Sequence, residues 1–289
     1  MGNFEMRKIQ WICDTVLLDR HDEFGFPALH DAAFEDGHAL LTTKYVPFCG
    51  ELTDYQKEDI KGFFRRDMPL VTYGCVGFLK AFKKINSMEM CPGSYFKIDE
   101  LKYSAAATHY GADMLNHEGM FLPYAEIIRR VKEKKNNPRI FMRPDGVTKA
   151  FAGRVFDFDD PSETPEALNQ YDPISPDEMC FFATPKEILG EYRHVICEHE
   201  VIAQSQYRWN GKLDIRTDVH NDCLRLAKEV SRNEWQPDYV YVVDTALTKD
   251  GPFIVEFNSF SCSGLYACNT KRIVERVAAA AWNEFEGNL

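Results

Sequence analysis

Two long apolar runs near the carboxyl end of the chain are joined by only four residues that favour turns. The runs are DYVYVVDTAL at 238–247 and PFIVEFNSF at 252–260, and TKDG at 248–251 lies between them. Strands joined by so short a connection can pair only side by side and antiparallel. The sequence therefore predicts a β-hairpin here, and the length of its loop decides which side chains share a face.

Three polar side chains of this hairpin point in directions that depend on the loop. If the loop is 249–251, with Gly251 left-handed, Asp244 lies directly opposite Glu256. Asn258 leaves the same face two residues later. A loop of two or four residues would turn Asp244 to the other face, unless a β-bulge restored the alternation. We expect the three-residue loop and a shared face.

Asp244, Glu256 and Asn258 would then present two carboxylates and one amide oxygen among Val, Phe and Ile side chains. Burying polar groups without partners costs about 2 to 7 kcal/mol each, so something must satisfy these oxygens. One candidate is a salt bridge to a neighbouring cation. The other is Mg²⁺, which prefers oxygen ligands and commonly binds one or two carboxylates together with nucleotide phosphates. The sequence predicts the metal site.

The charge of the chain limits its partners. It carries 45 acidic and 34 basic residues, a formal net charge of −11. A surface of this sign repels a phosphate backbone, so we expect no nucleic-acid duplex as a partner. A local basic cleft that binds a phosphorylated small molecule is compatible with this charge.

Neither a membrane span nor secretion is expected. The chain has no run of eighteen apolar residues, and its first twenty residues lack the apolar segment of a secretory signal. Its nine cysteines include no Cys-x-x-Cys pair, which is typical of reduced thiols rather than of disulfides or a zinc site. We expect a cytoplasmic protein.

The pattern of short elements indicates two units. YQKEDIKGFFRR at 55–66 predicts an amphipathic helix and PLVTYG at 69–74 a buried strand, as in an α/β layer. KEKKNNP at 132–138 is charged and rich in turn-forming residues, and is the best candidate boundary. We predict an amino-terminal α/β domain over 1–137 and a second domain over 138–289.

A second hairpin is predicted just after that boundary. RIFMR at 139–143 and KAFAGRVFDF at 149–158 are strand-like and flank PDGVT. With a five-residue loop, Arg143 faces Lys149 across the pair. Two like charges in this arrangement bind an anion between them, or they are solvated residues at a sheet edge.

The stretch EYRHVICEHE at 191–200 is predicted to be one strand. Alternation places Glu191, Arg193 and Cys197 on one face with His199, and His194 on the other. A metal site built from both histidines is therefore geometrically poor.

Three blocks of the sequence, in this order, resemble the ATP-grasp ligases. They are FMRPDGVTKAFAGRVF at 141–156, TPKEILGEYRHVICEHEVIAQSQYRW at 184–209 and VVDTALTKDGPFIVEFNSFSCSGLYACN at 242–269. The resemblance is strongest to the phage and bacterial clade named for its two arginines and one lysine. It implies an α/β (α+β) chain with the ATP-grasp fold, in which two α+β subdomains grip ATP. A smaller α/β domain precedes them, the lid subdomain spans about 138–195, and the metal-binding subdomain spans about 196–289.

The resemblance also implies the role of each site residue. Asp244, Glu256 and Asn258 would hold Mg²⁺, for which Mn²⁺ can substitute. Lys149 and Arg143 would bind phosphates, and Glu191 would bind the ribose. Arg193 would lie near the terminal phosphate or acyl phosphate, and it and Lys149 are the candidate catalytic residues. The segment with Phe182, Ala183 and Lys186 would contact the adenine.

The implied reaction is carbon–nitrogen bond formation with release of ADP and phosphate. Mg²⁺ and the cations would neutralise the nucleotide while a substrate carboxylate attacks the terminal phosphorus, and an amine would then displace phosphate from the acyl phosphate. The substrates would be a small-molecule or peptide carboxylate and an amine. Two alternatives stay open: a phosphotransferase (kinase) that uses the same site, and a nucleotide-binding module without catalysis. SCSGLYACN at 261–269 either lines the acceptor pocket or forms a turn before the helix that follows.

Overall fold

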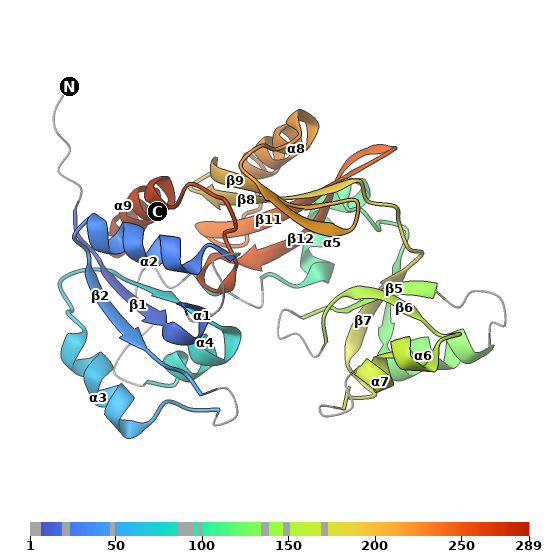
Figure 1. Cartoon of the computed structure of the whole chain (residues 1–289), viewed down its shortest axis with the longest axis horizontal. Helices are drawn as coiled ribbons and strands as arrows, with labels where there is room; N and C mark the ends of the chain where they lie inside the picture. Colours follow the sequence, from blue (N-terminus) through green and yellow to red (C-terminus); the bar gives the residue numbers. More distant parts are fainter. Residues whose placement is uncertain are drawn as a thin grey trace.

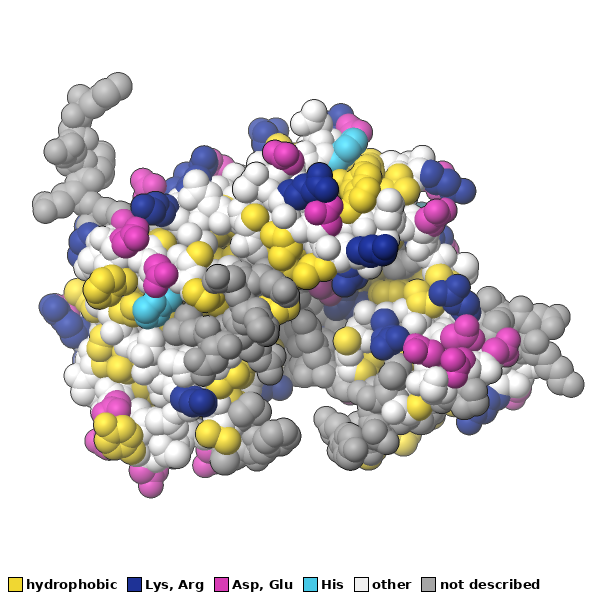
Figure 2. All heavy atoms as spheres, viewed as in Figure 1, with side chains coloured by type: hydrophobic (Ala, Val, Ile, Leu, Met, Phe, Trp, Pro, Cys, Tyr) yellow, Lys and Arg dark blue, Asp and Glu magenta, His cyan; other side chains and the backbone are white. Residues whose placement is uncertain are grey.

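A computed structural model describes residues 7–18, 24–46, 50–85, 95–97, 100–133, 139–146, 151–168 and 173–288. In this part of the chain the strands form three separate sheets, with helices packed on them (Figure 1). None of its helices has the length and apolar character needed to cross a membrane. On the face in Figure 2, Lys and Arg side chains are interspersed with Asp and Glu and do not gather into one broad patch.

The amino-terminal part contains a three-stranded parallel sheet with the order β2-β1-β3. Helices connect its strands, as parallel pairing requires. The predicted helix at 55–66 and buried strand at 69–74 are confirmed as α3 and β3. The elements are β1 (Gln10–Asp14), α1 (Thr15–Leu18), α2 (Phe26–Glu35), β2 (Ala39–Thr43), α3 (Asp54–Phe63), β3 (Leu70–Tyr73) and α4 (Val76–Lys83).

A four-stranded antiparallel sheet follows, with the order β4-β7-β5-β6. Its first strand, β4, lies before the boundary predicted at 137 and pairs with β7 beyond it, so this sheet draws on both sides of that position. The elements that lead into it and form it are α5 (Tyr103–Tyr110), η3 (Gly111–Asp113), β4 (Met120–Pro123), α6 (Tyr124–Glu133), β5 (Arg139–Pro144), β6 (Arg154–Asp157), η4 (Pro161–Glu163), α7 (Pro165–Leu168) and β7 (Met179–Ala183).

The predicted hairpin of β5 and β6 forms, but its predicted register is wrong. The ladder pairs Met142 with Arg154, so the second strand returns four residues later than expected. Gly153 therefore lies beside Arg143, and a Cβ atom built on Gly153 would approach the Arg143 Cβ to 3.0 Å. Lys149 lies outside the described residues.

The carboxyl-terminal part contains a five-stranded antiparallel sheet with the order β10-β9-β8-β11-β12. Helices α8 and α9 pack on it within separate apolar clusters, and α9 also joins it to the amino-terminal sheet through contacts with α2. Both helices were expected from apolar periodicity. The elements are β8 (Gly190–Cys197), β9 (Glu200–Trp209), β10 (Lys212–Arg216), α8 (Asn221–Ser231), β11 (Val240–Thr248), β12 (Gly251–Ser259), η5 (Phe260–Cys262) and α9 (Thr270–Phe285).

The predicted hairpin of β11 and β12 is confirmed, although its loop is shorter than expected. Thr248 pairs with Gly251, so the loop has two residues rather than three. The register then shifts between Asp244 and Thr245, which leaves Val255 as the extra residue of a β-bulge. Beyond the bulge, Asp244 pairs with Glu256 as predicted. The bulge corrects the change of face that the short loop introduces.

The segment at 191–200 is not one strand. It turns at Glu198 and His199, which have φ angles of 46° and 64° and join β8 to β9. Two consecutive residues with positive φ suit the twist of a two-residue hairpin loop. The prediction missed this turn because neither residue is Gly, Asn or Asp, the residues that usually adopt such angles.

Candidate active site

A cavity of about 590 Å³ lies where the three parts of the fold meet. Its described lining comes from the amino-terminal part, from β5 and β6, and from the strands β8, β9, β11 and β12. This volume is ordinary for a small-molecule site. Among the described lining residues, five are basic and three are acidic, in a chain whose net charge is −11. They are Arg143, Arg154, Lys186, Arg193, Arg208, Glu191, Asp244 and Glu256.

Three of these side chains form a row across adjacent strands. Arg193 of β8 pairs with Asp244 of β11, which pairs in turn with Glu256 of β12. Arg193 donates to Asp244 through Nε at 2.9 Å and through Nη2 at 2.7 Å, and its Nη1 donates to the Gly264 carbonyl at 2.6 Å. This guanidinium has five N–H groups, so these contacts fix its orientation and leave donors for a ligand.

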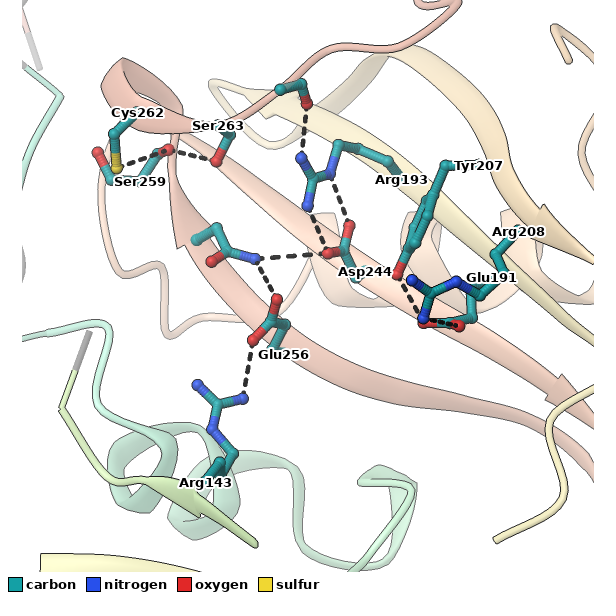
Figure 3. Close-up of polar contacts among 12 residues, drawn as sticks. Arg143, Glu191, Arg193, Tyr207, Arg208, Asp244, Glu256, Ser259, Cys262 and Ser263 are labelled. Atoms are coloured by element: carbon teal, nitrogen blue, oxygen red, sulfur yellow. Dashed lines mark hydrogen bonds and ion pairs between the residues drawn. The ribbon is translucent and has the colours of Figure 1, made fainter. Parts of the chain in front are cut away.

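Asn258 and Glu256 extend this row to the four-stranded sheet. Asn258 Nδ2 donates to Glu256 Oε1 at 2.9 Å and lies 3.4 Å from Asp244 Oδ2. Glu256 Oε2 accepts from Arg143 Nη1 at 2.9 Å (Figure 3). The predicted metal ligands therefore converge, and each carboxylate is paired with an arginine. The Arg143 pair also links β5 to β12.

Burial controls the proton affinity of the innermost pair. It raises the pKa of Asp244, Arg193 opposes that shift by favouring the carboxylate, and the nearby acids Glu256 and Glu191 raise it further. Burial also disfavours the charged form of Arg193, but Asp244 holds the pKa of Arg193 well above its ordinary value. The pair is thus a fixed cation beside acids that repel one another.

Glu191 lies on the same side of the sheet and is 9% exposed. It accepts from the Tyr207 hydroxyl at 2.8 Å and from Arg208 Nη1 at 3.1 Å (Figure 3). Burial raises the pKa of Tyr207, so its hydroxyl keeps its proton at neutral pH and acts as a donor. Glu191 is held in place as an acceptor at the wall of the cavity.

Not all the predicted site residues meet at the cavity. Lys186 lines it and is ion-paired with Glu118. Phe182 and Ala183 are placed by the structure but are not part of the described lining, and Ala183 is buried in the apolar cluster around α5. Lys149 belongs to the segment outside the described residues.

Comparison with known families identifies the fold. Residues 122–276 match a family of ATP-grasp domains, described as the second family of one ATP-grasp clade. The chain belongs to the ATP-grasp family. Comparison with curated protein sequences gives no match.

Solved ATP-grasp structures resemble the chain over nearly its whole length. The D-cycloserine synthetase DcsG has a TM-score of 0.59 at 10% identity, covering 95% of this chain and 100% of that chain. The D-alanine–D-alanine ligase of Bacillus anthracis with ATP has a TM-score of 0.57 at 9% identity, covering 98% and 100%. The ligase PsnB with its minimal precursor has a TM-score of 0.52 at 9% identity, covering 95% and 99%. At these identities the likeness shows the fold, and the predicted ATP-grasp fold is confirmed.

Several residues of this ATP-grasp cavity were missed in the sequence. Tyr207 and Arg208 of β9 both contact Glu191, and the Tyr266 ring lies 5.0 Å from the Arg193 guanidinium. Recognising the turn at 198–199 would have placed Arg208 directly opposite Glu191. Two opposite charges at matching positions of adjacent strands were therefore a usable signal.

The donors of this ATP-grasp site suit a divalent cation. Asp244, Glu256 and Asn258 supply the oxygen ligands that Mg²⁺ prefers, provided the Asn258 amide turns its oxygen toward the carboxylates. Two arginines already balance the two carboxylates. A dication would therefore need further negative charge or the departure of Arg143, and phosphates of a nucleotide would provide both.

Proposed function

We propose that this ATP-grasp protein is an ADP-forming carboxylate–amine ligase that works through an acyl phosphate and requires Mg²⁺. The observation that carries the proposal is the row of Arg193, Asp244 and Glu256, with Asn258 beside it, at the wall of a cavity with a net positive lining. Such a site can bind a metal–triphosphate complex. The titles of the DcsG, D-alanine–D-alanine ligase and PsnB structures name synthetases or ligases, which supports this reaction class.

The proposed roles follow from the geometry. Asp244, Glu256 and Asn258 hold Mg²⁺, which neutralises the phosphates and orients them. Glu191, fixed by Tyr207 and Arg208, accepts from the ribose hydroxyls.

Arg143, Arg193 and Lys149 are the proposed cations of the site, in keeping with the two arginines and one lysine of the clade resembled. Arg193 acts through its fixed charge, since three of its N–H groups donate to protein atoms. Phe182, Ala183 and Lys186 remain the proposed adenine contacts.

In the proposed reaction a substrate carboxylate oxygen forms a bond to the terminal phosphorus, and ADP leaves. The amine nitrogen then bonds to the acyl carbon, loses a proton, and inorganic phosphate leaves. This chemistry depends on positioning and electrostatic stabilisation rather than on a protein nucleophile. The arginines serve it by holding charge where the transferred phosphoryl group becomes more negative.

The seven described cysteines are all free thiols, and we propose a cytoplasmic location in keeping with them. We propose small-molecule or peptide substrates. One carries the carboxylate and the other the amine.

Product analysis tests the proposal. The protein is incubated with ATP, Mg²⁺ and pools of carboxylates and amines, and ADP and free phosphate are measured. We expect equal amounts of both products, formed only when a carboxylate and an amine are present together. Glu256→Gln is the matched inactive control. ADP formed without free phosphate would instead identify a phosphotransferase, and absence of ATP binding would reject both activities.

A further inference from the structure

Arg143 rests on an aromatic side chain that neither the sequence nor the family match singles out. Tyr103, the first residue of α5, is 3% exposed, and the guanidinium carbon of Arg143 lies 4.7 Å from the centre of its ring. The same guanidinium donates to Glu256. A cation at this distance over an aromatic ring is attracted by the negative face of the ring. Two contacts, one from α5 and one from β12, therefore hold the Arg143 charge.

The Tyr103 ring is itself held firmly. It packs against Phe181 at 4.6 Å and Phe121 at 6.2 Å between ring centres, both on strands of the four-stranded sheet. Its backbone N–H donates to the Asp145 carbonyl at 3.0 Å. Asp145 follows Arg143 by two residues, so the ring is tied to the segment that carries the guanidinium.

The start of α5 is fastened to that segment a second time. Ser104 donates to Asp145 through its backbone N–H at 2.7 Å and through its hydroxyl at 2.9 Å. A carboxylate that accepts from the first turn of a helix stabilises this end of the helix. The ring and the guanidinium therefore belong to one connected assembly, and a movement of one would carry the other.

The Tyr103 hydroxyl points to a polar partner at the edge of the cavity. Burial raises the pKa of Tyr103 to about 12, although Arg143 acts against this, so the hydroxyl remains protonated. Within the described residues, this hydroxyl and Asn116 Oδ1 are both buried without a hydrogen-bond partner. Asn116 is 5% exposed, lines the cavity and influences the pKa of Tyr103. A small rotation of the amide would pair donor with acceptor.

We propose that Tyr103 is a positioning residue whose ring face holds Arg143 where its charge meets both Glu256 and the phosphates of a bound nucleotide. The inference rests on the proposed function, because Tyr103 acts on the nucleotide only through Arg143. Cation–π contacts of this kind, partly shielded from water, change affinities by roughly tenfold.

Equilibrium binding of ATP with Mg²⁺, measured by calorimetry, tests this role. Tyr103→Leu removes the ring face and weakens ATP binding about tenfold. Tyr103→Phe keeps the face, loses only the hydroxyl, and restores binding to within about twofold of the wild type. Phe121→Leu is the matched control, because Phe121 packs in the same ring cluster, whereas the ring that Arg143 lies over is that of Tyr103.

A double-mutant cycle separates positioning from general packing. In the Arg143→Gln background, Tyr103→Leu should have no further effect on ATP binding, since the contact through which it acts is already gone. Thermal unfolding is recorded for every variant. If Tyr103→Leu unfolds below the assay temperature, Tyr103→Met replaces it, because Met fills a similar volume without a ring face.

Three outcomes overturn the proposal. Equal losses for Tyr103→Leu and Phe121→Leu would show that only packing matters. Additive losses in the double mutant would show that Tyr103 does not act through Arg143. A wild-type protein that does not bind ATP would end both this inference and the proposed function, whereas the first two results leave the proposed function standing.

Discussion

Arg143 occupies the position beside Glu256 that a divalent cation would need. Arg143 Nη1 lies 2.9 Å from Glu256 Oε2, and the two side chains are 10% and 26% exposed, so water screens the pair only in part. Arg143→Gln removes the cation and keeps a polar side chain of similar reach. We expect this variant to bind free Mn²⁺, used in place of Mg²⁺, more tightly than the wild type when no nucleotide is present.

The size of the effect follows from the pair that the metal must displace. A hydrogen bond between charged groups contributes about 1.5 to 3 kcal/mol, and about 1.4 kcal/mol corresponds to a factor of ten in affinity. Because Glu256 is partly exposed, the lower end of this range applies, which gives a gain of about tenfold. The same substitution should weaken ATP binding, since it removes a cation from the phosphate site. Opposite signs for the two ligands distinguish this effect from general damage to the fold.

Electron paramagnetic resonance measures free Mn²⁺ directly, and titrations at about 0.1 M salt, with and without ADP, give the affinities. Arg154→Gln is the control, because Arg154 lines the same cavity but pairs with Glu163 at 2.7 Å. Its Mn²⁺ affinity should match that of the wild type. The reasoning is refuted if Arg143→Gln binds free Mn²⁺ no more tightly than the wild type while both bind Mn²⁺ in the presence of ADP.

Three further substitutions test other parts of the site and the fold. Glu256→Gln should lower ATP-dependent turnover by roughly a hundredfold or more and leave the unfolding temperature near that of the wild type, and turnover close to normal would reject Glu256 as a metal ligand. Lys149→Ala should weaken ATP binding far more than Lys132→Ala on α6, and equal effects in calorimetry would remove Lys149 from the site. Burial raises the pKa of Asp238 to about 6, so the folded protein holds this proton more tightly than the unfolded chain. The free energy of unfolding should therefore fall by about 3 kcal/mol between about pH 4 and pH 6, and denaturant titrations of Asp238→Asn should lack this component.

The hairpin of β11 and β12 shows which part of the site a sequence can predict. Its apolar runs and turn residues indicated the pairing, and Asp244 does lie opposite Glu256. The loop was nevertheless one residue shorter than predicted, and only the bulge at Val255 kept the two acids on one face. Loop lengths that differ by one residue are nearly equivalent in local composition, so the convergence of side chains constrains the register more tightly than the turn does.

The turn between β8 and β9 shows where local pattern fails. Glu198 and His199 adopt positive φ angles, which turn propensities assign to Gly, Asn and Asp. Reading this region as one strand hid the pairing of Glu191 with Arg208. Tertiary packing on both sides of the hairpin overrides the weak local preference of these two residues.

The partner of Arg143 is a different kind of miss. Local register suggested an anion shared with Lys149, whereas the structure supplies Glu256 from a strand of another sheet. No local pattern relates residues so far apart in the chain.

The electrostatics of the whole chain and of the cavity point in opposite directions. The net charge of −11 argued against a polyanionic partner for the surface, yet the described cavity lining carries five cations against three acids. Both hold because the cations in excess, Arg154 and Lys186, pair with acids that lie outside the lining. A nucleotide then adds the negative charge that lets Arg143 exchange Glu256 for phosphate. If that exchange occurs, metal and nucleotide bind as a unit, and their affinities should rise together rather than independently.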